Sequence, residues 1–561
     1  MYSTLALFLG LAAAHRAPSV RHDHSFQPDH ILRVNAEYYS AACSERYSVL
    51  VNGSSPGPEL RLREGKVSWI RVYNDMMDEN TTMHWHGLTA FTAPFSDGAP
   101  AASQWPIPPG HFFDYEVKPE LGSAGTYFYH SHVGFQAITA KGPLIVDSCD
   151  PPPYHYDEDR TVMISDYFSE PDKEIVDGLV STNFTWSGET EAILVNGQTR
   201  SGTNATGDCR LAAITVEPRK TYRLRFIGAT ALSFVSLAME SHDVHIIEAD
   251  GHYTKALATR FLQIGSGQRY SVLLEAKSND ELKTLNKTQF YIQITTLERP
   301  EVLTNFAVLD YSSDSADLIT VPSPPPLPVA NTVQGWLDYA LESLSPDPNF
   351  PSLGEVTRRI IIDVHQNVSD RTIWLQNGYD WVQSFPKSPY LVDIYQNKLN
   401  LHATYRRALS RGQGFDNVTR TFPAKVGEVL EIVWQNRGTV ENGGVDAHPF
   451  HAHGRHFYDI GGGDELYNAT ANEKRLRGRH PIQRDTSVLY RYRKKTSQLD
   501  PSGWRAWRIR VTNPGVWMYH CHILQHMIMG MQTVFTFGDR GEILQAIGPV
   551  DEGYLTYGGS A

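Results

Sequence analysis

Short stretches in which apolar and polar residues alternate run along the chain between turn residues, and long helical periodicities are few. One pattern occurs three times, at 64–74, 217–227 and 426–436, each time as a charged turn followed by an alternating stretch. Because successive side chains of a strand point to opposite faces, each copy predicts a half-buried strand. The spacing of the copies predicts an all-β protein of three β-sandwich domains.

A sharper repeat connects the first and third copies. The segment Gly-Thr-Tyr-Phe-Tyr-His-Ser-His at 125–132 matches Gly-Val-Trp-Met-Tyr-His-Cys-His at 515–522 without a gap. His-Trp-His-Gly at 84–87 likewise matches His-Ala-His-Gly at 451–454. A proline-rich tract at 312–330 is typical of an extended linker. These features predict a signal peptide at 1–18, domains at 25–150, 155–315 and 345–540, a linker at 316–344 and a C-terminal tail at 541–561.

Composition narrows the possible partners and the compartment. The net charge of -12 argues against nucleic acid and against an anionic membrane surface. The apolar run that begins the chain is too short to span a bilayer and is typical of a signal peptide. Secretion is also indicated by Asn-x-Ser/Thr sequons, which lie at Asn52, Asn80, Asn183, Asn204, Asn286, Asn367, Asn417 and Asn468.

Ten of the 23 histidines fall into four short motifs. They are His84 and His86, His130 and His132, His448, His451 and His453, and His520, His522 and His526. On a strand, His-x-His places both imidazoles on one face, so pairs from the two terminal domains can converge on one shared site. Imidazole binds copper, iron, nickel or zinc, and one such pair alone is weak evidence for a metal site. Four pairs in duplicated positions strongly favour one.

Cys521 identifies the metal as copper. It points to the opposite face from its two histidine neighbours, and a thiolate joined by His448, His526 and a distant Met531 thioether is a blue-copper ligand set. Zinc has no redox chemistry and does not need this arrangement. At the positions that match Cys521, His526 and Met531, the first domain carries Ser131, Gln136 and Lys141. The sequence therefore predicts one thiolate copper that feeds a cluster shared by both terminal domains.

These motifs resemble those of multicopper oxidases, a family that includes laccases, ascorbate oxidases and ferroxidases. The resemblance covers essentially the whole mature chain and implies three cupredoxin-like Greek-key β-sandwiches and four copper ions per chain. It implies type 1 copper at His448, Cys521 and His526 with Met531 as axial ligand, and type 2 copper at His84 and His451. The implied ligands of the type 3 pair are His86, His130, His132, His453, His520 and His522. Dioxygen is expected to bind among the last three ions.

Segments 103–110, 216–225 and 248–251 most resemble the fungal branch related to ascorbate oxidases. This resemblance implies a disulfide between Cys43 and Cys209, and leaves Cys149 as a buried free thiol. It also matches Asp97 with a carboxylate that assists proton delivery, although a simple Asp-Gly turn is an alternative reading.

The sequence departs from the family at three places. Many relatives have cysteine where Trp105 stands and glutamate where Leu524 stands, and the C-terminus differs from the plug of many ascomycete laccases. The missing glutamate puts assisted proton delivery and metal-ion oxidation in doubt, which makes a ferroxidase the weaker reading.

The function we expect is oxidation of small phenolic compounds by dioxygen, including polyketide-type phenols of fungal secondary metabolism. A thioether axial ligand lowers the copper potential and so favours electron-rich substrates. The alternatives are an L-ascorbate oxidase and, from another class, a copper-binding protein without turnover. We also expect the second domain and the insertion between His453 and His520 to form walls of the substrate pocket.

Overall fold

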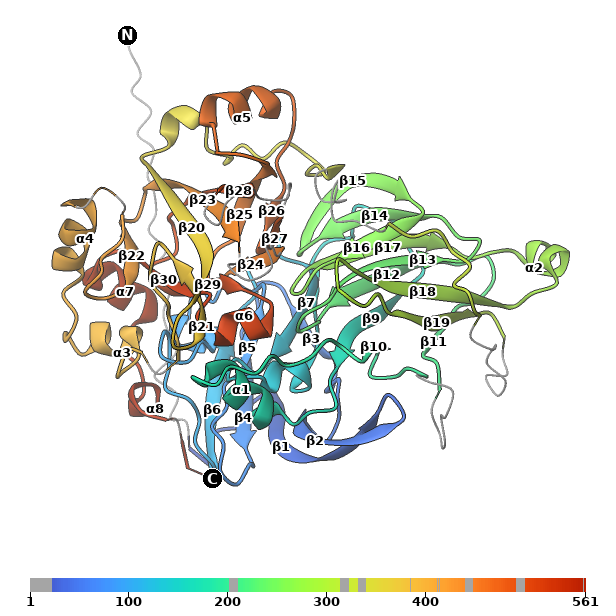
Figure 1. Cartoon of the computed structure of the whole chain (residues 1–561), viewed down its shortest axis with the longest axis horizontal. Helices are drawn as coiled ribbons and strands as arrows, with labels where there is room; N and C mark the ends of the chain where they lie inside the picture. The colour runs from blue at the N-terminus through green and yellow to red at the C-terminus, as the bar shows by residue number, and fades with distance from the viewer. Residues whose placement is uncertain are drawn as a thin grey trace, which may run out of the picture.

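The computed structural model describes residues 23–200, 210–312, 322–330, 340–383, 385–410, 412, 414–438, 447–490, 500–557 and 559–560. Six β-sheets form three pairs. Figure 1 shows the green strands of the second pair on one side of the molecule, and the blue and orange-red strands of the first and third pairs on the other. The predicted all-β class is confirmed.

The first pair contains a sheet of order β2-β1-β4-β6-β31 and a sheet of order β3-β8-β7-β5. Its elements are β1 (His30–Ala41), β2 (Ser44–Val51), β3 (Leu60–Arg63), β4 (Ser68–Asn74), β5 (His84–His86), β6 (His111–Val117), β7 (Gly125–His130), β8 (Lys141–Asp147), β31 (Gly559–Ser560) and the 3-10 turns η1 (Pro94–Asp97) and η2 (Gln136–Ile138). Strand β31 comes from the end of the chain and pairs with β6.

The second pair has the orders β10-β9-β12-β17-β14-β15 and β11-β19-β18-β13-β16. Its strands are β9 (Glu158–Tyr167), β10 (Ala192–Val195), β11 (Ala213–Thr215), β12 (Thr221–Gly228), β13 (Phe234–Met239), β14 (Val244–Ala249), β15 (His252–Thr259), β16 (Phe261–Ile264), β17 (Arg269–Glu275), β18 (Gln289–Leu297) and β19 (Thr304–Asp310). Helices α1 (Asp172–Val180) and α2 (Asn279–Leu285) lie in its loops.

The third pair has the orders β21-β20-β23-β28-β25-β26 and β22-β30-β29-β24-β27. Its strands are β20 (Arg358–Val368), β21 (Thr372–Gln376), β22 (Thr421–Ala424), β23 (Val429–Gly438), β24 (His448–Ala452), β25 (Phe457–Gly463), β26 (Gln483–Arg484), β27 (Thr486–Leu489), β28 (Gly503–Arg510), β29 (Gly515–Cys521) and β30 (Gln532–Phe537). The helical elements are η4 (Leu353–Glu355), α3 (Tyr390–Tyr395), α4 (Leu401–Ser410), α5 (Ala469–Leu476), α6 (Leu524–Ile528), α7 (Arg540–Ile547) and α8 (Glu552–Leu555).

The threefold sequence pattern corresponds to one structural position. Its copies become β4, β12 and β23, and each lies inside its sheet between a parallel and an antiparallel neighbour. β12 and β23 are buried along almost their whole length, so the half-buried strand predicted for these two copies is wrong: both faces of each strand are covered.

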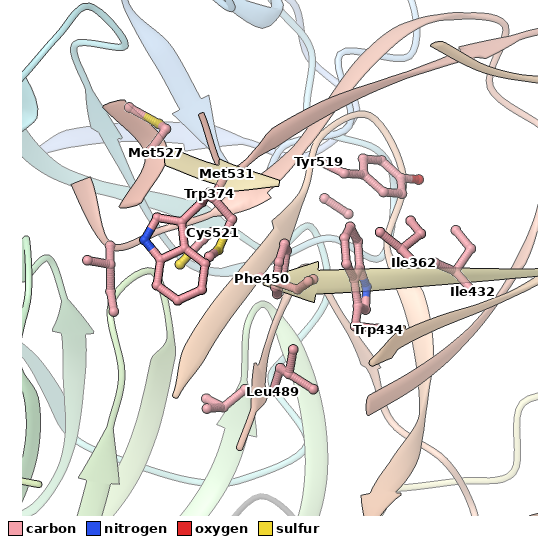
Figure 2. Packing of buried hydrophobic residues seen from close by; sticks show 14 of the residues in the cluster. Ile362, Trp374, Ile432, Trp434, Phe450, Leu489, Tyr519, Cys521, Met527 and Met531 are labelled. Carbon is pink, nitrogen blue, oxygen red and sulfur yellow. The ribbon is translucent and has the colours of Figure 1, made fainter. Parts of the chain in front are cut away.

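The domains share their apolar cores. One buried cluster joins Phe135 of the first domain and Leu232 of the second to Trp374 and Cys521 of the third, and Figure 2 shows its third-domain part. A second cluster joins the first-domain core to α3, α7 and Tyr554 of α8. Residues after 540, expected to form a tail, thus include two helices and a strand that pack on the first domain. The site described below lies where these cores meet.

The cysteines only partly follow expectation. Cys149 is a free thiol, but it is exposed, so its predicted burial is wrong. It follows the end of β8, where the chain leaves the sheet, and its backbone N–H donates to Glu64 Oε1 at 2.7 Å. Cys209 lies outside the described residues, as do the expected signal peptide and most of the linker, so the Cys43–Cys209 bridge stays a prediction.

Candidate metal centre

The His-x-His pairs of the first and third domains meet in one buried cluster. Within each domain, paired strands bring two motifs together: His84 lies opposite His130 on β5 and β7, and His451 lies opposite His520 on β24 and β29. The eight-histidine cluster comprises His84, His86, His130, His132, His451, His453, His520 and His522, all buried.

Ring nitrogens from the two domains lie within contact distance across the domain boundary. Nε2 of His84 is 3.3 Å from Nε2 of His451, and Nε2 of His132 is 3.3 Å from Nε2 of His520. Nε2 of His522 is 3.1 Å from Nδ1 of His86. Because both domains contribute ring nitrogens, neither could form this site alone.

These donors fit a soft or borderline metal ion. Three triads within the cluster each have ligand atoms within 4.8 Å of one another: His84–His86–His130, His84–His451–His453 and His132–His453–His520. Nε2 of His130 is buried without a hydrogen-bond partner, which a metal would supply. Burial and the neighbouring imidazoles lower the pKa of His84, His453 and His520 well below the ordinary value. The rings are therefore neutral, the form that ligates metals.

Backbone carbonyls fix the tautomer of four of the eight rings. Nδ1 of His84 lies 2.5 Å from the carbonyl of Asp97, and Nδ1 of His130 lies 2.8 Å from that of Ser131. Nδ1 of His451 and of His520 is 2.9 Å from the carbonyl oxygens of Asp485 and Cys521. A carbonyl only accepts hydrogen bonds, so each Nδ1 carries the proton and each Nε2 keeps its lone pair for a metal.

Two buried carboxylates contact the cluster, and their surroundings are opposite. Oδ2 of Asp97 accepts from Nδ1 of His453 at 2.8 Å, and burial raises the pKa of Asp97 well above its ordinary value. Asp485 Oδ1 is 3.1 Å from His86 Nε2, and the paired Arg269 guanidinium holds the pKa of Asp485 well below the ordinary value. Asp97 is thus suited to hold a proton, whereas Asp485 is a fixed anion.

A second group of donors surrounds Cys521. Its Sγ is 3.8 Å from Nδ1 of both His448 and His526, and these two Nδ1 atoms are 3.2 Å apart. The ring of Trp374 packs against both imidazoles at 4.8 Å between centroids. Met531 is fully buried beside them, and its carbonyl accepts from the Cys521 N–H at 3.0 Å (Figure 2). We call Cys521, His448 and His526 the thiolate site.

A second-domain loop lies beside the thiolate site. Nε2 of Gln525, next to His526 on α6, donates to Ser187 Oγ at 3.1 Å. Phe184 and Trp186 of the same loop pack partly buried against the shared core. The second domain thus lies close to His526, but the pocket walls expected from this domain and from the 453–520 insertion both stay predictions.

Sequence reasoning missed Ser266 and Asp485, which contact histidines of the cluster, and Arg269, which pairs with Asp485. Arg269 and Asp485 are 216 residues apart, and no local motif connects them. His456, which lies 3.4 Å from Asp485, did have a signal, since it follows His453 by three residues.

Family comparison agrees with this geometry. Three family models described as multicopper oxidase match residues 33–150, 158–314 and 385–540. "Laccase-like multicopper oxidase 1" of Thermothelomyces thermophilus is 44% identical over 100% of this chain and 95% of its own. An L-ascorbate oxidase of Cucumis sativus is 29% identical over 89% of this chain and 87% of its own.

Solved structures show the same fold at low identity. A laccase from Botrytis aclada aligns with a TM-score of 0.72 and 23% identity over 94% of this chain and 89% of its own. Fet3p, a multicopper oxidase that functions in iron import, aligns with a TM-score of 0.75 and 23% identity, over 95% and 96% of the two chains. From the three family matches and the full-length 44% relative, the chain belongs to the multicopper oxidase family, whose members are oxygen-using oxidoreductases.

Proposed function

We propose that this protein is a secreted, laccase-like oxidase that removes single electrons from phenolic compounds and passes them to dioxygen. The thiolate site would hold a copper that supplies one-electron oxidation of the substrate, and the cluster histidines would hold coppers that supply the four-electron reduction of dioxygen to water. The observation that carries the proposal is the position of Cys521. It belongs to the thiolate site, while its chain neighbours His520 and His522 belong to the cluster.

We assign the residues to copper ions as the resemblance to the family implies. His448, Cys521 and His526 would hold type 1 copper with Met531 as axial ligand, and His84 and His451 would hold type 2 copper. The type 3 pair would be held by His86, His130, His132, His453, His520 and His522. This assignment uses four ions per chain and leaves no cluster histidine unused.

The chain must also deliver protons, because reducing one dioxygen to two waters consumes four protons and four electrons. Asp97 is placed for this role: it bonds to His453 through its carboxylate and to His84 through its carbonyl. Burial raises the pKa of the Asp97 carboxyl well above its ordinary value, so it keeps a proton to a higher pH than an ordinary carboxyl and can release it nearby.

Support for phenolic substrates comes from the donor set and from relatives. The axial thioether lowers the reduction potential of the copper, which favours electron-rich substrates. The 44% identical relatives are named laccase-like multicopper oxidase and, in Gibberella zeae, multicopper oxidase aurL2. One-electron removal from a phenol yields a phenoxyl radical that can couple after release. A protein without turnover is disfavoured because every predicted ligand is present.

Secretion is supported by the sequons. Of the seven that lie within the described residues, six have an exposed asparagine: Asn52, Asn80, Asn183, Asn286, Asn367 and Asn468. In the described part of the chain, no helix has the length and apolar character needed to cross a membrane.

Oxygen uptake by the copper-loaded protein tests the proposal, with simple phenols, polyketide-type phenols and ascorbate assayed side by side. We expect fast uptake with phenols and slow uptake with ascorbate. Preference for ascorbate would reassign the protein as an ascorbate oxidase, and no uptake despite full copper would favour a protein without turnover.

A further inference from the structure

The second domain supplies none of the predicted copper ligands, yet one of its turns touches the cluster. Residues 265–268 connect β16 to β17, and the turn is closed by a hydrogen bond from Gln268 N–H to the Gly265 carbonyl. Gly267 has a φ of 84° at the tip of this turn. We call residues 265–268 the cluster turn.

The backbone of the cluster turn lies directly on two histidine rings. A Cβ atom at Gly267 would lie 3.0 Å from Cε1 of His86 and 3.2 Å from the ring carbons of His522. These distances are shorter than ordinary van der Waals contact, so only glycine lets the backbone come this close. The turn therefore limits how far either ring can tilt toward the second domain.

Ser266 fixes the orientation of His522. Its Oγ lies 2.8 Å from Nδ1 of His522 and also contacts the carbonyl oxygens of Thr230 and His522. The hydroxyl hydrogen must point to one of these carbonyls, which leaves an oxygen lone pair facing Nδ1. Nδ1 then carries the ring proton, and Nε2, the atom 3.1 Å from His86, is free to bind metal.

Arg269, directly after the cluster turn, fixes the orientation of His86 through the Asp485 carboxylate. Its guanidinium donates to both carboxylate oxygens of Asp485 at 2.6 Å, and Asp485 Oδ1 accepts from Nε2 of His86 at 3.1 Å. All three groups are fully buried. Since Nε2 of His86 donates, its Nδ1 is the atom left to bind metal, opposite Nε2 of His522.

We propose that the cluster turn, with Ser266, Gly267 and Arg269, is the positioning element that sets the ring orientation and tautomer of His86 and His522. It thereby adjusts the spacing and coupling of the type 3 copper pair. The proposal rests on the copper assignment proposed above. It gives the second domain a definite role in the cluster, as a provider of the partners that orient the ligands rather than of the ligands themselves.

The test compares Ser266→Ala and Gly267→Ala with matched controls. Ser236→Ala removes a buried second-domain hydroxyl that accepts from the Ala330 N–H at 3.1 Å. Gly427→Ala places a methyl at a φ of 90° where no atom lies within 4 Å. Each purified, copper-loaded protein is analysed for copper content, blue absorption and EPR-detectable copper.

A coupled type 3 pair gives no EPR signal, so about half of the copper in the parent should be detectable if the four-ion assignment is right. In both cluster-turn variants we expect the blue band to remain. We expect either that a larger fraction of the bound copper becomes EPR-detectable or that copper is lost from the type 3 pair. Copper affinity at this pair should fall about 10–100-fold, as for other partners that orient metal ligands. The control variants should match the parent.

Parent-like EPR and copper affinity in Ser266→Ala would overturn the positioning role, even if Gly267→Ala failed to fold. Loss of the blue band together with all copper in Ser266→Ala would also overturn it, because a positioning role predicts selective loss. Absence of a blue band or of bound copper from the parent would instead overturn the proposed function.

Discussion

The first and third domains share a duplicated motif but differ in what fills the space behind it. Where the third domain has His448, Cys521, His526 and Met531, the first has Thr81, Ser131, Gln136 and Lys141. The first-domain side chains satisfy one another: Thr81 and Ser131 bond to Gln136 Oε1 at 3.0 and 2.8 Å, and Gln136 Nε2 donates to the Asn80 carbonyl. Lys141 donates to the Ala229 carbonyl.

The third-domain side chains are arranged differently. Sγ of Cys521 lies 3.8 Å from Nδ1 of both imidazoles, and Nε2 of His448 is buried without a hydrogen-bond partner. The same strand framework therefore holds a closed hydrogen-bond network in one domain and an open donor set in the other. On the proposed copper assignment, four side chains, rather than the fold, decide which of the two domains accepts electrons.

The largest difference between the two domains should appear when Cys521 on β29 and its counterpart Ser131, which follows β7, are each replaced. Cys521→Ser should abolish the blue band and reduce turnover by more than about 100-fold, beyond the effect of losing a ligand-orienting partner. Ser131→Ala, at the equivalent first-domain position, should keep the blue band and at least about half of the turnover, because it removes a hydroxyl that bonds to Gln136 and keeps the backbone carbonyl that accepts from His130. Absorption spectra and oxygen uptake of both variants check this; equal losses in the two would contradict it.

The next largest effect concerns the anion that joins the domains. Asp485→Asn leaves Arg269 with a weakened partner and should destabilise the metal-free protein by about 3–5 kcal/mol. The pKa of Asp485 is lowered in the fold, so its contribution is present above the ordinary carboxyl pKa and is lost as pH falls through the folded value. Thermal unfolding against pH measures this.

Asp75→Asn is the control for that prediction, since the Arg33–Asp75 pair is partly exposed and should change stability by less than about 1 kcal/mol. An equal loss of unfolding free energy in the two variants would contradict the larger contribution assigned to the buried Asp485–Arg269 pair.

Replacing Asp97 should lower activity without lowering stability, whereas replacing Asp485 lowers stability. Its folded pKa is raised, so the protonated form stabilises the fold below the ordinary pKa, and this contribution is lost as pH rises through the folded value. Asp97→Asn mimics the neutral acid and should leave the metal-free protein at least as stable at neutral pH. Turnover should nevertheless fall about 10–100-fold because proton delivery is removed. A variant with parent-like turnover across the pH range would refute the role of Asp97.

The smallest effect is expected at Lys141, the counterpart of Met531. Burial lowers the Lys141 pKa from 10.5 to about 7, so its stabilising contribution is present above the unfolded value and is lost as pH falls through about 7. As pH rises between these two values, the free energy of unfolding of the parent should increase by up to about 1.4 kcal/mol per pH unit relative to that of Lys141→Met. Unfolding measured in this range should show that difference in slope; parallel curves would mean that Lys141 stays charged.

The sequence contained most of the cluster because a His-x-His motif is local and duplicated. Strand alternation alone predicted that His84 and His86 share a face, and the structure places them with their partners in one buried cluster. The threefold strand pattern was equally readable, since β4, β12 and β23 repeat the same charged turn and alternation.

What could not be predicted depends on packing between distant segments. Arg269 and Asp485 meet only because the second and third domains pack together. Cys149 has an apolar side chain but lies where the chain leaves β8, and Tyr554 lies in a segment without strong periodicity yet is buried against the first domain. Composition and periodicity carry no information about such contacts.

The most direct test of this account is EPR spectroscopy with metal analysis on the copper-loaded parent and on Cys521→Ser. The account predicts four copper ions in the parent with a single thiolate-type signal, and loss of that signal and of one ion in the variant. A thiolate-type signal that survives in Cys521→Ser would contradict the assignment of a single electron-accepting site to the third domain.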